Sequence, residues 1–441
     1  MRFSFRAAAL LIALTITCLV PGYCRAAFEY IDITSPSLRK IPLAVPIFKS
    51  LTPNYSEDKI AVEGADLLAS TLDFTGYFKL LDRGAFLEDP RKTGLVPPTL
   101  KLTNWTTIGA ELLVTAGVSV SGTLLEMELR LYDTFKGRLV VGKRYTGYIT
   151  DQRKIIRRFC SEVIFELTGN RGIFSSKIAF VSTGTKTKEI YTCDFDGYDP
   201  MQLTRSRSIT LSPAWSWDGQ WLAYTSYEKG NPDLFIRHLN EKRGTVVSKK
   251  GINITPAWVP NQFALAATLS FSGDQEIYLL TGSGEIIKNL TSNWGIDVSP
   301  SWSPDGKQMA FVSDRAGSPQ IYIKNIDSGE ARRLTFEGKY NTSPSWSPKG
   351  DKIAYESKDN GNFNIRVIGV DGAGLYQLTN DAGDNESPSW APDGSLIAFS
   401  STREGPSRIF IMTAFGTDQR RLLALPGEQT NPSWSPNIAP N

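Results

Sequence analysis

A tryptophan-centred phrase returns six times in the second half of the chain at a nearly constant spacing. Its clearest copy is SPSWSPDG at residues 299–306. The six tryptophans are separated by 43, 44, 44, 44 and 44 residues, and they are Trp215, Trp258, Trp302, Trp346, Trp390 and Trp434. A fixed period of this length is typical of one supersecondary unit repeated in an array. The repeat therefore constrains the fold more than any other feature of the sequence.

Each repeat contains the same series of predicted strands. The Pro-x-Trp segment is followed by an alternating strand such as KIAFVS at 177–182, then by a strand such as EIYTCDF at 189–195 and a short edge strand such as RRLT. Four strands every ~44 residues are the size of one propeller blade. Because proline is confined to edge positions, we expect the Pro-x-Trp strand to be an edge or innermost strand, with its tryptophan between blades. Asp-Gly pairs provide the positive φ of the hairpin turns.

The order of the repeats also predicts how the ring closes. The alternating strand first occurs at Lys177, whereas the Pro-x-Trp strand first occurs at Trp215 and last at Trp434. The two series are out of phase by one strand, so the first sheet lacks an inner strand and the C-terminus has one left over. Pairing these leftovers predicts a six-bladed all-β propeller over residues 175–441 with no long open edge.

The first 26 residues have the pattern of a cleaved secretory signal. Arg2 and Arg6 precede an apolar run over residues 7–20, and small residues stand at both recognition positions of a cleavage site after Ala26. The apolar run is too short to cross a bilayer, so we expect a soluble, exported chain that is not inserted in a membrane. Removal of three arginines leaves 45 basic and 45 acidic residues, which argues against a nucleic-acid partner.

Two cysteines remain after the predicted leader, which contains Cys18 and Cys24. An oxidising compartment permits a disulfide between Cys160 and Cys193, but the two fall in different predicted domains, so two free thiols are slightly favoured. Metal-ligand spacing is absent from the sequence, and we expect neither a metal nor another cofactor.

A different pattern precedes the ring. Residues 41–169 read as a small α/β domain that begins with the strand IPLAVPIF and contains a helix over residues 56–72. Three strands in a meander follow, ELLVTAGVSV, LLEMELRLYD and GRLVVGKRYTG, and an amphipathic helix over 151–167 closes the domain. We expect both helices on one face of the sheet and a short hinge at residues 170–174.

The signal, the α/β domain and the six SPxWSPDG blades together resemble the TolB family, the periplasmic component of the Tol-Pal cell-envelope system of Gram-negative bacteria. The resemblance covers the whole chain, and its more specific parts are the junction LTGNRGIFSSKIAFVS and the turn DFDGYDPMQLT. It implies a non-enzymatic, monomeric periplasmic adaptor that supports outer-membrane integrity and constriction during cell division.

The resemblance also implies that the lipoprotein Pal binds at the mouth of the propeller, on the loops before the Pro-x-Trp strands. Trp294 and Tyr340 are the expected aromatic anchors of this site. For Trp294 the alternative is packing between blades. The expected Pal-binding residues are Arg205, Arg207, Ile252, Asn253, Thr255, Trp294, Asp297, Val298, Tyr340, Asn341, Thr342, Asp384, Asn385, Glu386, Gln429 and Thr430.

The same resemblance implies that residues 27–40, AFEYIDITSPSLRK, form a mobile segment that binds the inner-membrane protein TolA. Bacteriocins exploit this surface in the family. Its apolar-acidic-apolar triplets suit a strand added to a partner's sheet edge. A frayed terminus and a strand held on its own domain remain open as alternatives. The expected TolA-binding residues are Phe28, Tyr30, Ile31 and Ile33.

Three other kinds of site compete with this interpretation. A serine hydrolase would need a Gly-x-Ser-x-Gly turn and a histidine, but no such pentapeptide occurs and the single histidine, His238, lies within a predicted strand. A propeller glycosidase or carbohydrate-binding protein stays open as the alternative function, since several acids, Asp297, Asp384, Glu386 and Glu428, lie near the mouth. The acidic run at 194–199 resembles part of a calcium loop, but similar turns in other blades favour a recurrent hairpin.

Overall fold

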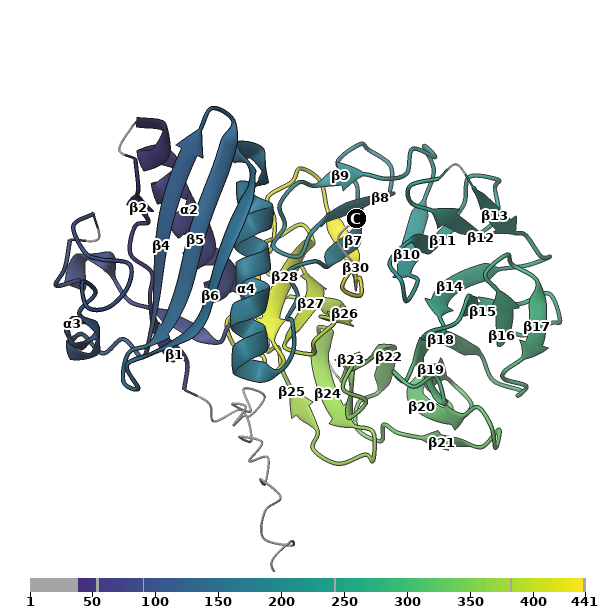
Figure 1. Cartoon of the computed structure of the whole chain (residues 1–441). Coiled ribbons are helices and arrows are strands. Elements are labelled where there is room, and N and C mark those ends of the chain that lie inside the picture. Colours follow the sequence, from purple (N-terminus) through teal and green to yellow (C-terminus); the bar gives the residue numbers. More distant parts are fainter. Residues whose placement is uncertain are drawn as a thin grey trace, which may run out of the picture.

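The computed structural model describes residues 39–438 except 53–54, 90, 242, 360 and 381–382. An N-terminal α/β domain lies beside a ring of six four-stranded sheets (Figure 1). The predicted fold class is therefore confirmed. The leader and the segment 27–38, with all four expected TolA-binding residues, lie outside the described residues.

The α/β domain is built on one mixed sheet. Its strand order is β3-β1-β4-β5-β6, and β2 pairs with β4. The predicted strand IPLAVPIF is shorter than expected, because Pro46 has no N–H to continue the ladder beyond Ala44. The strands are β1 (Ile41–Ala44), β2 (Lys49–Ser50), β3 (Phe78–Leu80), β4 (Leu112–Ser121), β5 (Leu124–Asp133) and β6 (Arg138–Tyr148).

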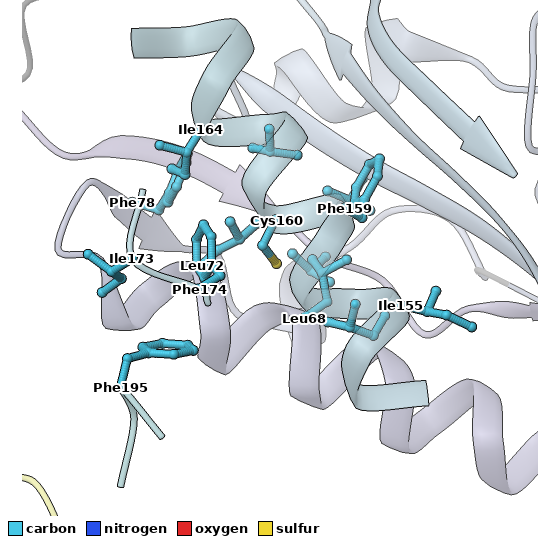
Figure 2. Close-up of a cluster of buried hydrophobic side chains, with 14 of the residues drawn as sticks. Leu68, Leu72, Phe78, Ile155, Phe159, Cys160, Ile164, Ile173, Phe174 and Phe195 are labelled. Atoms are coloured by element: carbon cyan, nitrogen blue, oxygen red, sulfur yellow. The ribbon is translucent and has the colours of Figure 1, made fainter. Parts of the chain in front are cut away.

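Two long helices cover one face of this sheet, as predicted. They are α2 (Tyr55–Phe74) and α4 (Gln152–Thr168), while the short α3 (Leu102–Thr107) and the 3-10 turns η1 (Arg83–Ala85) and η2 (Ile149–Asp151) lie in connections. The buried face of α4 repeats at helical spacing and faces α2 (Figure 2). Gly169 ends α4 in the left-handed conformation, φ 74°, and its N–H donates to the carbonyl of Phe165.

The ring consists of six blades of four antiparallel strands. Blades 1 to 5 follow one another along the chain, and blade 6 joins the two ends of the propeller sequence. The strands are, from inner to outer: β10 (Thr210–Trp215), β11 (Trp221–Ser226), β12 (Asp233–His238) and β13 (Gly244–Val247) in blade 1; β14 (Asn253–Trp258), β15 (Ala264–Leu269), β16 (Glu276–Thr281) and β17 (Ile286–Asn289) in blade 2; β18 (Asp297–Trp302), β19 (Gln308–Ser313), β20 (Gln320–Asn325) and β21 (Ala331–Arg333) in blade 3; β22 (Tyr340–Trp346), β23 (Lys352–Lys358), β24 (Asn364–Gly369) and β25 (Tyr376–Gln377) in blade 4; β26 (Asn385–Trp390), β27 (Leu396–Ser401), β28 (Arg408–Thr413) and β29 (Arg420–Arg421) in blade 5; and β30 (Gln429–Trp434), β7 (Lys177–Ser182), β8 (Glu189–Asp194) and β9 (Met201–Gln202) in blade 6.

The tryptophan of each repeat lies buried between its own blade and the preceding one. The indole N–H of Trp258 donates to the carbonyl of Ala214 at 3.2 Å, and that of Trp302 donates to Ala257 at 3.1 Å. Trp215 completes the ring by donating to Ser433 in blade 6 at 2.9 Å. The tryptophan phrase is thus the joint between blades, as its spacing predicted.

The residue before each repeat proline has a feature that the sequence pattern did not reveal. Its φ is positive in all six blades, from 48° to 55°, although none of these residues is glycine. The pairing register between inner and second strands shifts at the same place in every blade, so each inner strand carries a bulge. The residues are Ser212, Thr255, Ser299, Ser343, Ser387 and Asn431.

The ring closes as predicted, because the C-terminal strand β30 pairs antiparallel with β7. Register partners include Trp434 with Ile178 and Gln429 with Ser182. The indole of Trp434 donates to the hydroxyl of Ser176 at 2.8 Å. The last strand of the chain therefore supplies the inner strand that the first sheet lacks.

The two domains share one hydrophobic core rather than meeting at a hinge. Ile173 and Phe174, within the expected hinge 170–174, are buried beneath α4, and Phe174 meets Phe195 of the ring edge to face at 5.6 Å between ring centroids (Figure 2). Moving the domains apart would expose these side chains to water, so the hinge interpretation is corrected. Cys160 and Cys193 are free and buried in this core, and the disulfide alternative is excluded.

The acidic turn at 194–199 is an ion-pair partner of the α/β domain. Arg157 on α4 lies 2.8 Å from the carboxylate of Asp194 and 3.1 Å from that of Asp196. Lys177 also contacts Asp194, at 2.8 Å, and these cations hold the pKa of Asp194 below its usual range against the opposing effect of burial. The turn joins the domains and is therefore not a calcium loop.

Candidate functional site

One end of the ring is formed by two kinds of connection. These are the inner-strand loops, which lead into β10, β14, β18, β22, β26 and β30, and the hairpins between the second and third strands of each blade. Backbone hydrogen bonds join the two kinds alternately, for example from Asn253 to Pro232 at 2.9 Å and from Ser270 to Ile252 at 3.1 Å. We call these connections together the rim. Because loop and hairpin alternate round the ring, each loop is held on both sides.

Buried acids at the start of third strands hold two of the inner-strand loops. Glu276 accepts hydrogen bonds from the hydroxyl of Thr291 at 2.5 Å and from the backbone of Asn293 at 2.8 Å. Glu189 accepts equivalent bonds from Thr204 and from the N–H of Arg207. Burial raises the pKa of Glu276 above its usual range. Sequence reasoning missed these anchors, although each precedes the threonine of a Leu-Thr pair by 15 residues.

Trp294 is the most exposed aromatic side chain among the predicted site residues. It is 75% exposed on the loop between blades 2 and 3, and Tyr340 on the next loop is 43% exposed. The packing alternative for Trp294 is therefore excluded. The loop beneath Trp294 is fixed by Glu276 and by the N–H of Ile296, which donates to Asp314 at 2.7 Å.

Five predicted contact residues are buried and need correction. Each is the first or second residue of an inner strand, and its side chain points into the blade. Four of them hydrogen-bond their own loop, whereas Asp297 accepts from Arg315 of the adjacent hairpin. Asn253 donates to the carbonyl of Lys249 at 2.9 Å, and Asn385 donates to that of Gly383 at 3.0 Å. They position the rim and do not lie on its surface. The fully buried residues are Asn253, Asp297, Asn341, Asn385 and Gln429.

The remaining predicted residues lie on the rim or on the adjacent channel wall. Arg205 and Arg207 are exposed, like Trp294 and Tyr340. The partly exposed members are Ile252, Thr255, Val298, Thr342, Asp384, Glu386 and Thr430. The structure thus brings most of the predicted residues to one end of the ring.

Two arginines on hairpins of the rim bind buried side chains at the start of inner strands. Arg315 lies 2.7 Å from the carboxylate of Asp297 and stacks 4.9 Å from the ring centroid of Tyr322. Arg403 makes the same arrangement in blade 5, donating to Asn385 at 2.8 Å over the ring of Phe410. Both arginines fix the backbone next to the exposed loops, so the rim is rigid where it is exposed.

A buried carboxylate lies between blades 4 and 5. Glu356 on β23 accepts a hydrogen bond at 2.7 Å from the backbone of Ser387, the bulge residue of the next blade. Burial raises its pKa to about 7, with the charges of Glu386 and Asp384 acting in the same direction. Since Glu356 is enclosed and bonded to the backbone of blade 5, its place in the structure is that of a joint between blades.

The opposite end of the channel is a cavity of about 520 Å³. The side chains that line it are all uncharged and come from the Pro-x-Trp phrases of the six blades. Trp217, which replaces the second proline of the repeat in blade 1, is 49% exposed at this end. The lining of this end of the channel is therefore uncharged, unlike the rim, which carries charged side chains.

His238 is buried in blade 1, where its ring meets Trp221 edge to face at 4.9 Å between centroids. Its Nδ1 accepts the N–H of Glu241 at 2.9 Å, which makes it a structural residue. Across residues 39–438, outside the gaps named above, no three His, Cys, Asp or Glu side chains converge as metal ligands. None of the helices in this part of the chain combines the length and apolar character needed to cross a bilayer.

Comparison with known proteins places this architecture among described families. The model of the TolB beta propeller domain matches residues 165–438, and that of the TolB amino-terminal domain matches residues 29–140. The chain is 62% identical over 284 residues to the Tol-Pal system protein TolB of Desulfosudis oleivorans, and 43% identical over 285 residues to the protein TolB homolog of Chlorobium chlorochromatii. These alignments span 64% and 65% of this chain and 65% and 64% of the two relatives.

A solved structure shares both domains. The crystal structure of TolB from Acinetobacter baumannii superimposes with a TM-score of 0.79 at 26% identity, covering 90% of this chain and 97% of that one. The order of the two domains and the ring are thus common to both chains.

Proposed function

The chain belongs to the TolB family, and from this premise we propose that it is a periplasmic component of the Tol-Pal system that acts as an adaptor and not as an enzyme. In this proposal the rim binds Pal and the N-terminal segment 27–40 binds TolA. Joining these two partners would support outer-membrane integrity and constriction during cell division.

The observation that carries the Pal proposal is the exposed Trp294 on a rim whose backbone is rigid. Large aromatic side chains on a pre-organised surface are typical of interface hot spots, because little conformational entropy is lost on binding. The loop under Trp294 is held by Glu276, Asp314 and Asp297, so the indole is presented before any partner arrives.

The TolA proposal concerns a segment next to the described domain. Lys40, its last residue, lies 2.6 Å from the carboxylate of Asp418 on blade 5. This contact places the described end of the segment beside the junction between the α/β domain and the ring. Its apolar residues, Phe28, Tyr30, Ile31 and Ile33, would pair as a strand with a sheet edge of TolA.

The test of the Pal site compares two exposed tryptophans at opposite ends of the ring. We expect Trp294→Ala to weaken binding of soluble Pal by about 2 kcal/mol, roughly 30-fold in Kd, when measured by calorimetric titration. Trp217→Ala removes the same side chain from the other end and should leave Kd within about twofold of the unsubstituted chain. Equal affinities for all three chains would contradict a rim centred on Trp294, and absence of saturable binding would remove the Pal proposal altogether.

The two partner sites are separated by a second titration. A chain lacking residues 27–38 should lose binding to the soluble domain of TolA while it still binds Pal. Retained TolA binding by the shortened chain would disprove the assignment of TolA to this segment.

A further inference from the structure

A ring of six similar blades presents a docking problem. The inner-strand loops and hairpins repeat six times round the rim with the same backbone arrangement. A partner that recognised only this repeated backbone would fit equally well in six rotational settings. A single productive setting therefore requires side chains that break the repeat.

Basic side chains collect on one third of the rim. They lie on the hairpin of blade 6 and on the loops leading into blades 1 and 2. With the hairpin of blade 1 between the two loops, these connections follow one another round the ring. All six are exposed: Lys186, Lys188, Arg205, Arg207, Lys249 and Lys250. The one exposed acid in this stretch, Glu228, has Lys229 next to it. We call this stretch, residues 183–188, 205–209, 227–232 and 248–252, the basic arc.

Acidic side chains collect on another third. The hairpins of blades 4 and 5 and the loops into blades 5 and 6 carry Asp359, Asp384, Glu386, Glu404 and Glu428, each exposed or partly exposed. We call this stretch, residues 358–363, 383–386, 402–407 and 424–428, the acidic arc. Two of these acids pair with arginines outside the arc, Asp359 with Arg366 at 2.5 Å and Glu404 with Arg421 at 3.3 Å, whereas Asp384, Glu386 and Glu428 carry most of its negative charge. The two basic members of the arc are only partly exposed. Lys358 lies over the ring of Phe363, and Arg403 donates to the buried Asn385.

The remaining third is apolar and aromatic. It lies between the other two on the ring, on the hairpins of blades 2 and 3 and the loops into blades 3 and 4. Five exposed side chains define it as the aromatic arc: Phe271, Trp294, Ile296, Phe336 and Tyr340. Its exposed and partly exposed charges, Asp274, Asp314, Arg315, Glu337 and Lys339, nearly cancel.

We propose that this division of the rim into basic, aromatic and acidic arcs selects one rotational setting for the bound protein. The partner that fits has an apolar patch for the aromatic arc, an acidic patch against the basic arc and a basic patch against the acidic arc. This inference rests on the proposed function, since it takes Pal as the protein that occupies the rim.

The physical reason is that a misplaced charge costs more binding free energy than a matched pair of opposite charges contributes. Rotation by a third of a turn in either direction would bring charge of like sign together or place a charged patch against the aromatic arc, with loss of hydration. Opposite charges also steer the approaching partner before contact, an effect that salt screens over about 10 Å at 0.1 M ionic strength. The aromatic arc supplies the affinity, and the charged arcs choose the setting.

Crosslinking shows directly which rotational setting the bound partner occupies on the ring. One cysteine is placed in each arc at an exposed, uncharged position: Thr185→Cys, Ser292→Cys or Pro406→Cys. The native Cys160 and Cys193 are fully buried and do not compete. Soluble Pal carrying a thiol-reactive crosslinker at one surface position is added to each exported chain at saturation. We expect each Pal position to react with one arc only.

Reversing the charge of single rim side chains tests whether the charged arcs determine the rotational setting. Arg205→Glu with Lys250→Glu should weaken Pal binding roughly tenfold at low salt and flatten its salt dependence. The matched control, Lys307→Glu with Lys154→Glu, changes the net charge equally away from the rim and should leave Kd within about twofold. Adding Glu404→Lys and Glu428→Lys to the first pair lowers the net charge of both arcs, so each Pal position should then react with more than one arc.

The outcomes separate this inference from the proposed function. Saturable binding with all three arcs crosslinking equally would overturn the single setting while leaving the rim as the Pal site. An unchanged crosslink pattern in the chain with all four substitutions would overturn the role of charge. If Pal does not bind at all, the proposed function fails, and this inference fails with it.

Discussion

At the scale of single residues, the buried Glu356 makes the stability of the ring depend on pH. Its pKa is about 7 in the folded chain, compared with 4.5 for an ordinary glutamate. The folded state therefore holds this proton more tightly, and its free energy of unfolding falls as pH rises from about 4.5 through 7 and stays reduced above that. The ionised form lowers stability by up to about 3.5 kcal/mol, since each pKa unit corresponds to about 1.4 kcal/mol.

We expect Glu356→Gln to remove this loss. The amide oxygen still accepts the N–H of Ser387, and no charge has to be buried. In urea unfolding the variant should be more stable than the unsubstituted chain at pH 8, while the two should converge near pH 4.5. Glu404→Gln, at an exposed carboxylate of blade 5, is the control and should follow the unsubstituted chain at both pH values. Parallel curves for Glu356→Gln and the unsubstituted chain would contradict the role given to Glu356.

Residue type alone could not show which predicted rim residues are exposed to a partner and which are buried and hold the rim loops in place. Asn253 and Asp297 stand in the predicted loops beside exposed residues, and both types are common at protein surfaces. Their direction is set by the pairing of inner and second strands, in which Asn253 opposes Leu269 and Asp297 opposes Ser313. That register includes a bulge, which a hydrophobic pattern does not reveal. Exposed Trp294 was correctly anticipated because it departs from the repeat.

At the scale of elements, the bulge in each inner strand stores backbone strain. A serine at φ 55°, as at Ser299, occupies the left-handed region that only glycine adopts without cost. Ser299→Gly should leave stability unchanged or raise it by up to ~1 kcal/mol, whereas Ser299→Ile should lower it by about 1 to 3 kcal/mol because a β-branched side chain clashes there. Midpoints of thermal unfolding would measure both effects.

The control for this pair is Ser248, an exposed serine outside the positive-φ set. Ser248→Ile should change the unfolding free energy by no more than about 0.5 kcal/mol. If isoleucine were tolerated equally at both positions, the left-handed backbone of the inner strands would not be a source of strain.

The strands and the long helices were predictable because their patterns extend over many residues. The 44-residue period fixes four strands per blade, and the apolar positions of α4 recur at helical spacing. The segment 170–174 was misjudged as a hinge because Asn and Gly favour a break in regular structure. Its Ile173 and Phe174 are buried by elements distant in sequence, and only tertiary packing could show this.

At the scale of the whole molecule, the α/β domain and the ring behave as one body in the structure. Their shared core includes side chains of α2, α4, β8 and β27, and the ion pairs of Arg157 with Asp194 and Asp196 surround it. In the proposed function, the rim would receive one partner on this single body, and the segment that ends at Lys40 beside blade 5 would receive the other. This arrangement suits an adaptor better than a cleft that closes over a substrate.

The integrity of this body depends on its last strand, β30. A chain ending at Ala424 lacks β30, so β7 becomes an exposed edge and the tryptophan joint between blades 6 and 1 is lost. We expect this chain to associate in size-exclusion chromatography and to unfold at a lower temperature, because an unpaired edge strand in a ring is a template for pairing.

A synthetic peptide of residues 425–438 should restore the monomer peak and raise the unfolding midpoint by refilling the sixth blade. The same peptide with Trp434→Ala should rescue much less, since that indole is buried between blades and bonded to Ser176. Full stability of the shortened chain without peptide would mean that closure through β30 does not hold the ring together.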